Sequence, residues 1–157
     1  MSSVKKVIEI LIEKGWHISF AESCTGGMCC SALVDEANAS SVLDMSFVTY
    51  ANEAKIELLG VSADTILANG VVSEEVAREM AIGVSKRAKS EIGVGVTGVA
   101  GPGGGTAKKP VGMVCFGFCI NGDVKTYTMH FGQLGRNNVR KASVEFVYNT
   151  ILDLMNE

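Results

Sequence analysis

The sequence has few of the residues on which several common enzyme chemistries depend. It contains only two histidines, His17 and His130, so a Ser-His-Asp triad would need one of them to reach the active site. Its five cysteines are an odd number without the paired C-x-x-C spacing of a zinc site, and with two histidines they offer no three-ligand catalytic zinc centre. We therefore expect neither a metal nor any other cofactor.

Long apolar runs and charge of one sign are absent as well. The segment 111–120 falls short of the roughly 18 to 20 residues that cross a bilayer, and the first 15 residues lack the apolar stretch of an export signal. The net charge of -3 is spread along the chain without runs of lysine or arginine, which argues against a reader of nucleic-acid backbones. Unpaired cysteines in such a chain are typical of reduced thiols. We expect a soluble, cytoplasmic protein with no membrane or nucleic-acid partner.

The sequence does contain alternating helical and extended patterns over 157 residues, enough for one domain, 1–157, with a single core. Apolar spacing predicts helices near 4–12, 28–34, 52–59, 73–88 and 139–155, and strands near 17–21, 47–50, 92–97, 111–120 and 124–131. Asn52 is the expected N-cap of its helix, and Asn121-Gly122 is suited to a tight hairpin turn. Helices should therefore cover a mixed sheet that ends in an antiparallel hairpin.

Two glycine-rich turns each follow a predicted strand. Ser23-Cys24-Thr25-Gly26-Gly27 precedes a helix, a geometry in which backbone N–H groups collect around an anion, although a plain capped turn would look the same. Gly98 to Gly105 holds five glycines after Thr97 but has neither the phosphate-binding G-x-x-x-x-G-K-[ST] spacing nor a dinucleotide fingerprint. Because ligands bind beyond the carboxyl ends of parallel strands, we expect the two turns to flank one pocket.

A serine paired with a lysine is the catalytic combination that the composition leaves available. A lysine kept neutral by burial can take the proton of a serine hydroxyl, and Lys55, near the start of a predicted helix, is the first candidate. The pattern alone favours Ser23 as the nucleophile. Two alternatives stay open: Lys55 is an ordinary solvated lysine, or the Cys24 thiol at a helix start is the nucleophile instead.

Four blocks of the sequence resemble one known family, the CinA C-terminal domain family of nicotinamide mononucleotide deamidases. The blocks are Ala21 to Gly27, Phe47 to Lys55 with Leu58-Leu59-Gly60-Val61, Val71 to Ala77, and Val96 to Pro102 running on to Lys109-Pro110-Val111-Gly112. The resemblance implies a three-layer α/β/α sandwich with a mixed, mostly parallel sheet. It also implies hydrolysis of the mononucleotide's carboxamide to nicotinate mononucleotide and ammonia in pyridine nucleotide salvage, by the stand-alone form of the domain.

The resemblance also assigns roles to single residues. Ser40 matches the proposed nucleophile, Lys55 its base and Tyr50 a positioning hydroxyl, and Arg136 is expected near the anionic end of the substrate. The remaining residues expected to line the substrate site are Ser23, Thr25, Gly26, Gly27, Asn52, Thr97, Gly98 and Gly101. The choice between Ser40 and Ser23 stays open. The expected partners are this small-molecule substrate and further copies of the chain, and the alternative function is a non-catalytic nucleotide-binding module.

Overall fold

A five-stranded sheet organises the molecule in the computed structural model, which describes residues 1–156. The strands are β1 (Ile18–Glu22), β2 (Phe47–Val48), β3 (Ile92–Gly98), β4 (Met113–Ile120) and β5 (Asp123–His130). Their order is β2-β1-β3-β4-β5. The β1 strand pairs with β2 and β3 in parallel, whereas β4 is antiparallel to both β3 and β5. Only β4 therefore runs against the other strands, and the predicted mixed, mostly parallel sheet with its terminal hairpin is confirmed.

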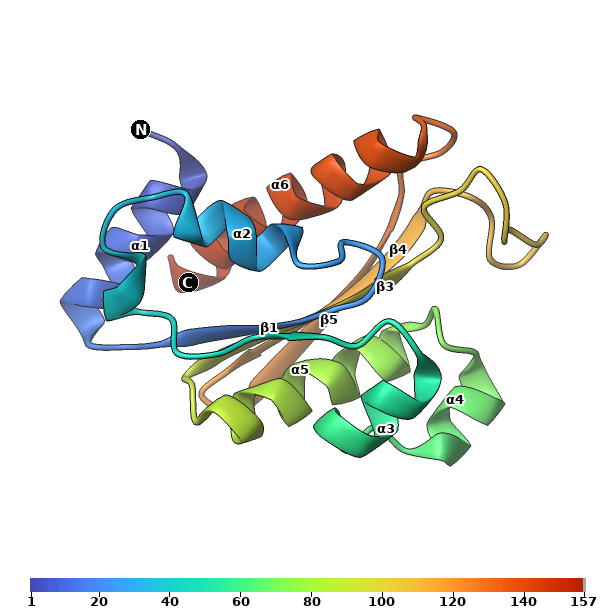
Figure 1. The fold of residues 1–157 in the computed structure, drawn as a ribbon, viewed down its shortest axis with the longest axis horizontal. Helices are drawn as coiled ribbons and strands as arrows, with labels where there is room; N and C mark the ends of the chain where they lie inside the picture. The colour runs from blue at the N-terminus through green and yellow to red at the C-terminus, as the bar shows by residue number, and fades with distance from the viewer. Residues whose placement is uncertain (157) are drawn as a thin grey trace.

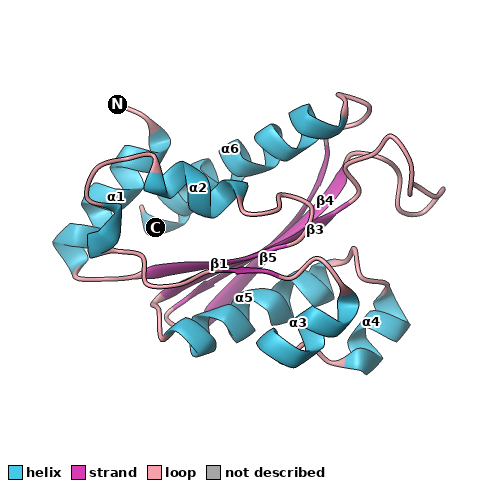
Figure 2. Cartoon of the chain, viewed as in Figure 1, coloured by secondary structure: helices cyan, strands magenta, loops and turns pink. Residues whose placement is uncertain are grey.

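Helices cover both faces of this sheet, as Figures 1 and 2 show. One layer holds α1 (Ser3–Lys14), α2 (Met28–Val34) and α6 (Arg136–Met155), and the other holds α3 (Asn52–Leu59), α4 (Ala63–Asn69) and α5 (Glu74–Ala88). A short 3-10 turn, η1 (Ala39–Ser41), lies between α2 and β2. The expected three-layer α/β/α sandwich is thus the observed architecture. Within residues 1–156, no helix has the length and apolar character that crossing a membrane requires.

Apolar clusters lie between the sheet and each helical layer. The largest lies under α1, α2 and α6, where Phe20 packs against Tyr148 with ring centroids 6.0 Å apart and Phe116 packs against Phe146 at 4.5 Å. A second cluster joins α5 to the other face. Because side chains alternate along a strand, Phe20 of β1 faces the first core and the next residue, Ala21, faces the second.

Glycines in the middle strands let α5 lie directly on the sheet. A Cβ added at Gly95 would lie 2.5 Å from the Ala77 carbonyl oxygen, and one at Gly117 would lie 2.3 Å from the same oxygen. Real Cβ atoms do not approach an oxygen so closely, so these positions require glycine for packing. The close contact sets the distance between α5 and the sheet, and α3 in turn packs on α5.

The structure differs from the sequence-based expectations at two helices. Helix α4 was not predicted, and it buries none of its residues, so its sequence lacks a continuous apolar stripe. Asn52 was predicted as the N-cap of α3, but that prediction is wrong: Ala51 has the extended backbone of the cap position and Asn52 is the first helical residue. The cap at Ser73 is confirmed, since its hydroxyl accepts from the Val76 N–H at 3.2 Å.

Replacing Gly95 with alanine should lower the free energy of unfolding by about 1–3 kcal/mol, because the new methyl group would overlap the α5 backbone. Gly103→Ala is the matched control, since a Cβ at that position meets no atom within 4 Å. Urea denaturation of the two variants and the parent measures both values. Equal stability of the two variants would show that α5 moves away without cost.

Candidate functional site

Ser23 lies immediately beyond the carboxyl end of β1. Its backbone N–H donates to the Val96 carbonyl at 3.1 Å, so the turn is fastened to the carboxyl end of β3 as well. Gly26 and Gly27 have φ of 57° and 101°, a conformation that favours glycine, and the chain then enters α2. Because β1 and β3 are parallel, the Ser23 turn and the glycine-rich loop that follows β3 begin at the same end of the sheet.

Lys55 of α3 reaches this turn from the opposite helical layer. The side chain is 1% exposed, and Nζ donates to Ser23 Oγ at 3.1 Å and to the backbone carbonyls of Thr49 and Tyr50 at 2.6 and 3.3 Å. These acceptors are all neutral. Within residues 1–156, the only ion pair joins His17 to Asp44, so Lys55 is a buried amine without a carboxylate.

Burial lowers the pKa of Lys55 below its ordinary value of 10.5, because the charged ammonium loses its hydration. The neighbouring Cys24 raises it by a smaller amount. A lowered pKa increases the neutral fraction of the amine near neutral pH. In the neutral form Nζ has a lone pair directed at a hydrogen-bond partner, and Ser23 Oγ is the only partner with a removable proton. The pair can therefore act as nucleophile and base.

Glu22 holds the other side of the turn. Its carboxylate is 1% exposed and accepts from the N–H groups of Cys29 and Cys30, at 2.8 and 3.0 Å, in the first turn of α2. The Ser23 turn was expected either to collect backbone N–H groups around an anion or to be a plain capped turn, and two of the N–H groups at the start of α2 are taken by Glu22. The buried charge is satisfied by these donors, which fixes α2 against the end of β1.

The Cys24 thiol does not suit nucleophilic chemistry. Burial raises its pKa to about 11, and Glu22 adds to this, whereas Arg140 and Lys55 oppose it. Because the thiolate is the reactive form, a thiol with this pKa is almost entirely protonated near neutral pH. The raised pKa of Cys24 therefore makes Ser23 the better candidate for the nucleophile.

A second polar cluster is centred on Arg136, which contacts Tyr50 and Gly101. Arg136 is the first residue of α6, and its guanidinium donates to the Tyr50 hydroxyl at 3.1 Å and to the Gly101 carbonyl at 2.7 Å. The Tyr50 side chain is 63% exposed, so its hydroxyl is open to a ligand, while its backbone carbonyl belongs to the Lys55 contacts. Three of the residues assigned through the resemblance thus form one cluster.

The other predicted lining residues are less directly available. Thr97 is 1% exposed and its hydroxyl donates to the Val71 carbonyl at 3.0 Å, which makes it a link between β3 and the segment before α5. A Cβ at Gly98 would lie 2.7 Å from a Val114 methyl carbon, so this glycine serves strand packing. Thr25 is fully buried in the turn, and Asn52 is exposed at the start of α3.

Ser40 is not part of this cluster. It is exposed in η1, two residues before Val42, whose carbonyl accepts from Ile18 N–H at the amino end of β1. At about 3.3 Å per residue, β1 separates that end from Ser23 by more than 13 Å. Within one chain, the serine hydrogen-bonded to Lys55 is Ser23, whereas Ser40, which the resemblance matches to the nucleophile, lies toward the other end of β1.

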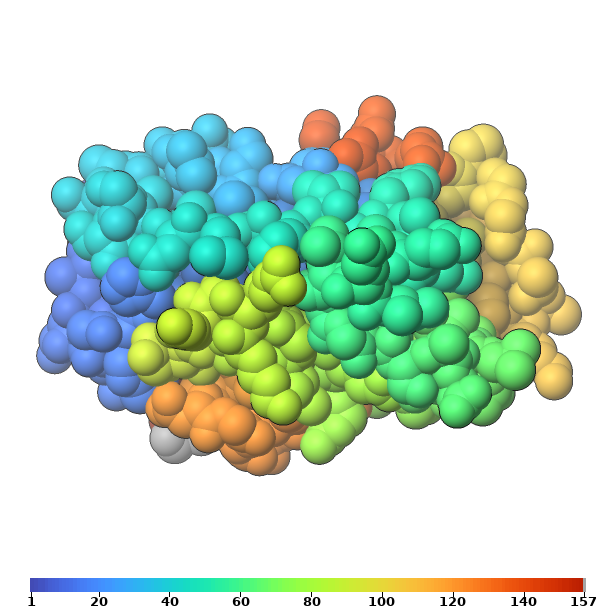
Figure 3. Space-filling view, turned by 60° about the horizontal axis from the view of Figure 1, so that its bottom comes forward, coloured from blue at the N-terminus to red at the C-terminus, as the bar shows by residue number. Residues whose placement is uncertain are grey.

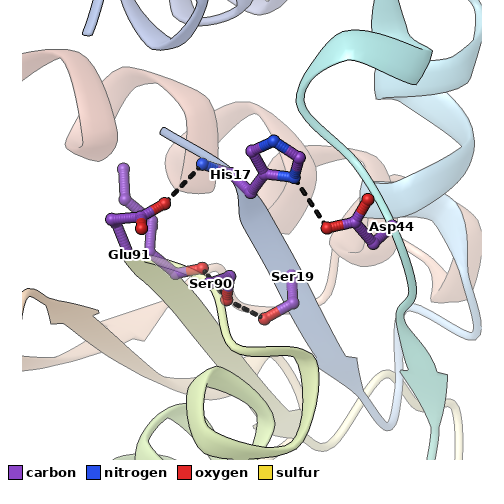
Figure 4. Close-up of polar contacts among 6 residues, drawn as sticks. His17, Ser19, Asp44, Ser90 and Glu91 are labelled. Carbon is purple, nitrogen blue, oxygen red and sulfur yellow. Dashed lines mark hydrogen bonds and ion pairs between the residues drawn. The ribbon is translucent and has the colours of Figure 1, made fainter. Parts of the chain in front are cut away.

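The amino end of β1 carries a separate polar group (Figure 4). The His17 ring nitrogen Nδ1 lies 2.6 Å from Asp44 Oδ2, and the His17 N–H donates to Glu91 at 2.7 Å. Ser19 and Ser90 share a buried hydrogen bond of 2.6 Å. These contacts fasten the segment before β2 and the start of β3 to β1, and they leave His17 at the end of the sheet opposite Ser23.

Lys109 ties the glycine-rich segment to the α3–α5 layer. Its Nζ donates to the carbonyls of Asn69 and Val72, beside an open cleft of about 440 Å³ whose walls include Glu74 and Cys115. Figure 3 shows this segment, in gold, at one end of the face formed by α3 to α5. The residues that line this cleft do not include Ser23 or Lys55.

Sequence reasoning missed one residue of the site, Arg140. Its Nε and Nη2 donate to the carbonyls of Cys24 and Thr25 at 3.0 and 3.2 Å. Contacts to backbone carbonyls leave no motif in a sequence. The available signal was spacing, because Arg140 follows Arg136 by four residues and so lies on the same face of α6.

The chain is similar to known proteins over nearly its whole length. Residues 1–155 match the model of the CinA C-terminal domain. The nicotinamide-nucleotide amidohydrolase PncC of Enterobacter agglomerans is 45% identical, and the match covers 96% of each chain. A competence-damage inducible protein of Clostridium acetobutylicum is 47% identical over 92% of this chain, which spans only 36% of that relative's length.

Solved structures give the same result. Competence/damage inducible protein CihA of Agrobacterium tumefaciens superposes with a TM-score of 0.95 at 40% identity, covering 99% of this chain and 94% of that one. A CinA superfamily protein of Escherichia coli gives a TM-score of 0.93 at 34% identity, covering 97% and 88%.

Proposed function

The chain belongs to the CinA C-terminal domain family, and on that premise we propose that it is an amidohydrolase that converts nicotinamide mononucleotide to nicotinate mononucleotide and ammonia. The observation that carries the proposal is the hydrogen bond between Lys55 Nζ and Ser23 Oγ, made by a buried lysine with no carboxylate partner within residues 1–156. A relative named for this activity matches 96% of the chain. The five free cysteines are consistent with a cytoplasmic location for such salvage chemistry.

In the proposed mechanism, Ser23 Oγ attacks the carboxamide carbon while Lys55 takes the hydroxyl proton. The carbonyl oxygen becomes an oxyanion, which backbone N–H groups near Ser23 would bind. Lys55 then returns its proton to the departing ammonia. Water, activated by the same amine, releases nicotinate mononucleotide from the Ser23 ester.

The anionic end of the substrate would lie at Arg136. This guanidinium is exposed, is already directed at the Tyr50 hydroxyl, and has no carboxylate partner in the described part of the chain. Charge-assisted hydrogen bonds from arginine to phosphate are strong, so the 5'-phosphate should contribute to binding. Phosphate binding is assigned to Arg136 and not to the start of α2, whose N–H groups belong to Glu22.

Ammonia release from nicotinamide mononucleotide, nicotinamide riboside and nicotinamide tests the proposal directly. The mononucleotide should have the highest kcat/KM, because only it presents the phosphate to Arg136. Heat-inactivated protein serves as the blank. Absence of ammonia from all three compounds, with binding of the mononucleotide by calorimetry, would support the alternative of a non-catalytic nucleotide-binding module.

Ser23→Ala and Lys55→Ala should each lower kcat by about 10³-fold or more, because each removes one member of the nucleophile and base pair. Lys55→Arg should also be inactive, since a guanidinium does not accept a proton near neutral pH. Ser40→Ala is the matched control at the far end of β1 and should keep turnover within about threefold of the parent. Loss of turnover in Ser40→Ala with normal turnover in Ser23→Ala would reverse the assignment.

The pH dependence of the rate follows from the state of Lys55. Only the neutral amine can act as base, so kcat/KM should rise with pH and reach a plateau as Lys55 loses its proton. Because burial lowers the pKa of this group, the midpoint should lie below 10.5, the ordinary value for lysine. The pH profile is measured in buffers of constant ionic strength. If kcat/KM does not rise at any pH up to 10.5, Lys55 is excluded as the base.

A further inference from the structure

Glu22 is a buried carboxylate that the proposed reaction does not use, and it directly precedes Ser23. The residue is 1% exposed. Its Oε1 accepts from the Cys29 N–H at 2.8 Å and its Oε2 from the Cys30 N–H at 3.0 Å, and no cation is paired with it within residues 1–156. A buried charge is costly unless hydrogen bonds satisfy it, so these two N–H groups hold the Glu22 side chain in one place.

The same two hydrogen bonds fasten both ends of the Ser23 turn. Gly27 is the N-cap residue of α2 and makes no side-chain cap, and Glu22 supplies that cap from β1 instead. The segment 23–28 therefore leaves the strand at Glu22 and returns to N–H groups that the same carboxylate binds. Within the turn, the Gly26 N–H donates to the Ser23 carbonyl at 3.0 Å. The backbone of Ser23 is thus held in a short, closed segment.

Holding Glu22 toward one face of the sheet directs Ser23 toward the other. Successive side chains of an extended chain point to opposite faces, and Ser23 continues β1, since its N–H donates to the Val96 carbonyl of β3 at 3.1 Å. Glu22 contacts α2, whereas Ser23 Oγ accepts from Lys55 Nζ at 3.1 Å in the opposite helical layer. A single hydrogen bond adds only modestly to stability, so the direction of the Ser23 side chain depends mainly on its backbone.

We propose that Glu22 is a positioning residue, which holds the Ser23 backbone so that the hydroxyl stays within hydrogen-bond distance of Lys55. The inference rests on the proposed amidohydrolase function and deepens it. Glu22 touches no reacting atom. The pKa of Lys55 is lowered by burial and raised by Cys24, so Glu22 acts on the position of the nucleophile and not on the basicity of the amine.

Glu22→Gln keeps the size of the side chain but replaces one acceptor oxygen with an NH2 group, which would face an N–H group of α2. We expect kcat for ammonia release to fall about 10- to 100-fold, because a small displacement of a reacting group is costly, with KM changed less than threefold. The midpoint of the pH profile of kcat/KM should stay at the parental value. A folded Glu22→Gln with parental kcat, or with a shifted midpoint that accounts for the loss, would overturn the proposal.

Glu79→Gln is the matched control. Glu79 also binds the start of a helix from a distance, because its carboxylate accepts from the Ser62 N–H at 2.7 Å and the Thr65 hydroxyl at 2.6 Å at the start of α4. Thermal denaturation should show a lower Tm for both variants, whereas kcat should fall only in Glu22→Gln. An equal fall of kcat in the two variants would show that general destabilisation is the cause and would overturn the proposal.

Removal of an N–H donor tests the same contact from the side of α2. Cys30→Pro removes the N–H that binds Glu22 Oε2, and the first turn of a helix tolerates proline, while Cys30→Ala keeps the N–H. The value of kcat should fall in Cys30→Pro and stay parental in Cys30→Ala. Equal kcat in these two variants would contradict the role of Glu22, and this test remains available if Glu22→Gln does not fold.

Labelling of Ser23 by a fluorophosphonate separates this inference from the proposed substrate. Ser23 Oγ forms a bond to phosphorus while its proton passes to Lys55 and fluoride leaves. If the parent protein is labelled at Ser23 but releases no ammonia from the mononucleotide, the proposed substrate is wrong. Labelling at least tenfold slower in Glu22→Gln would then still support the role of Glu22, and an unchanged rate would overturn it. A parent protein that is neither labelled nor active would overturn both proposals.

Discussion

An ammonium group loses much of its hydration when it is buried, and Lys55 is buried where no carboxylate compensates for that loss. Burial therefore lowers the pKa of Lys55, which increases the neutral fraction of the amine that the proposed mechanism uses as its base. The rest of the site depends on this condition. A carboxylate near Nζ would stabilise the charged form and leave less neutral amine to accept a proton, so the neutral acceptors around Lys55 fit its proposed role as well as satisfying its hydrogen bonds.

The end of β1 shows how strand geometry separates conflicting charges. Successive side chains point to opposite faces, so Ala21 packs toward α5, Glu22 toward α2, and Ser23 again toward the layer that carries Lys55. Glu22 and Lys55 are therefore kept on opposite sides of the sheet. The Glu22 carboxylate accepts hydrogen bonds from two N–H groups of α2, and the Lys55 amine has no carboxylate partner within residues 1–156. A shift of one residue in the register of β1 would place the carboxylate on the face of Lys55 and the serine on the face of α2.

Local patterns predicted the elements of this fold better than they predicted the site. The helices at 28–34 and 52–59, the Ser73 cap and the hairpin at Asn121-Gly122 follow from apolar spacing and turn chemistry, which are local properties. Helix α4 has no buried residue and so left no periodic signal. The choice between Ser23 and Ser40 needed a distance between segments, which a motif does not contain, and the role of Glu22 depended on a helix folding back onto its own strand.

Helix α6 brings two arginines to the same end of the sheet, with different tasks. Arg136 and Arg140 are four residues apart and so share a face, and the fully buried Val139 between them fixes the rotation of the helix. Arg136 is exposed and contacts groups that a ligand can displace or join, whereas Arg140 binds the backbone of the turn. Although the chain has a net charge of -3, neither guanidinium has a carboxylate partner within residues 1–156. Two positive charges at the carboxyl end of β1 would favour the anionic group of the proposed substrate.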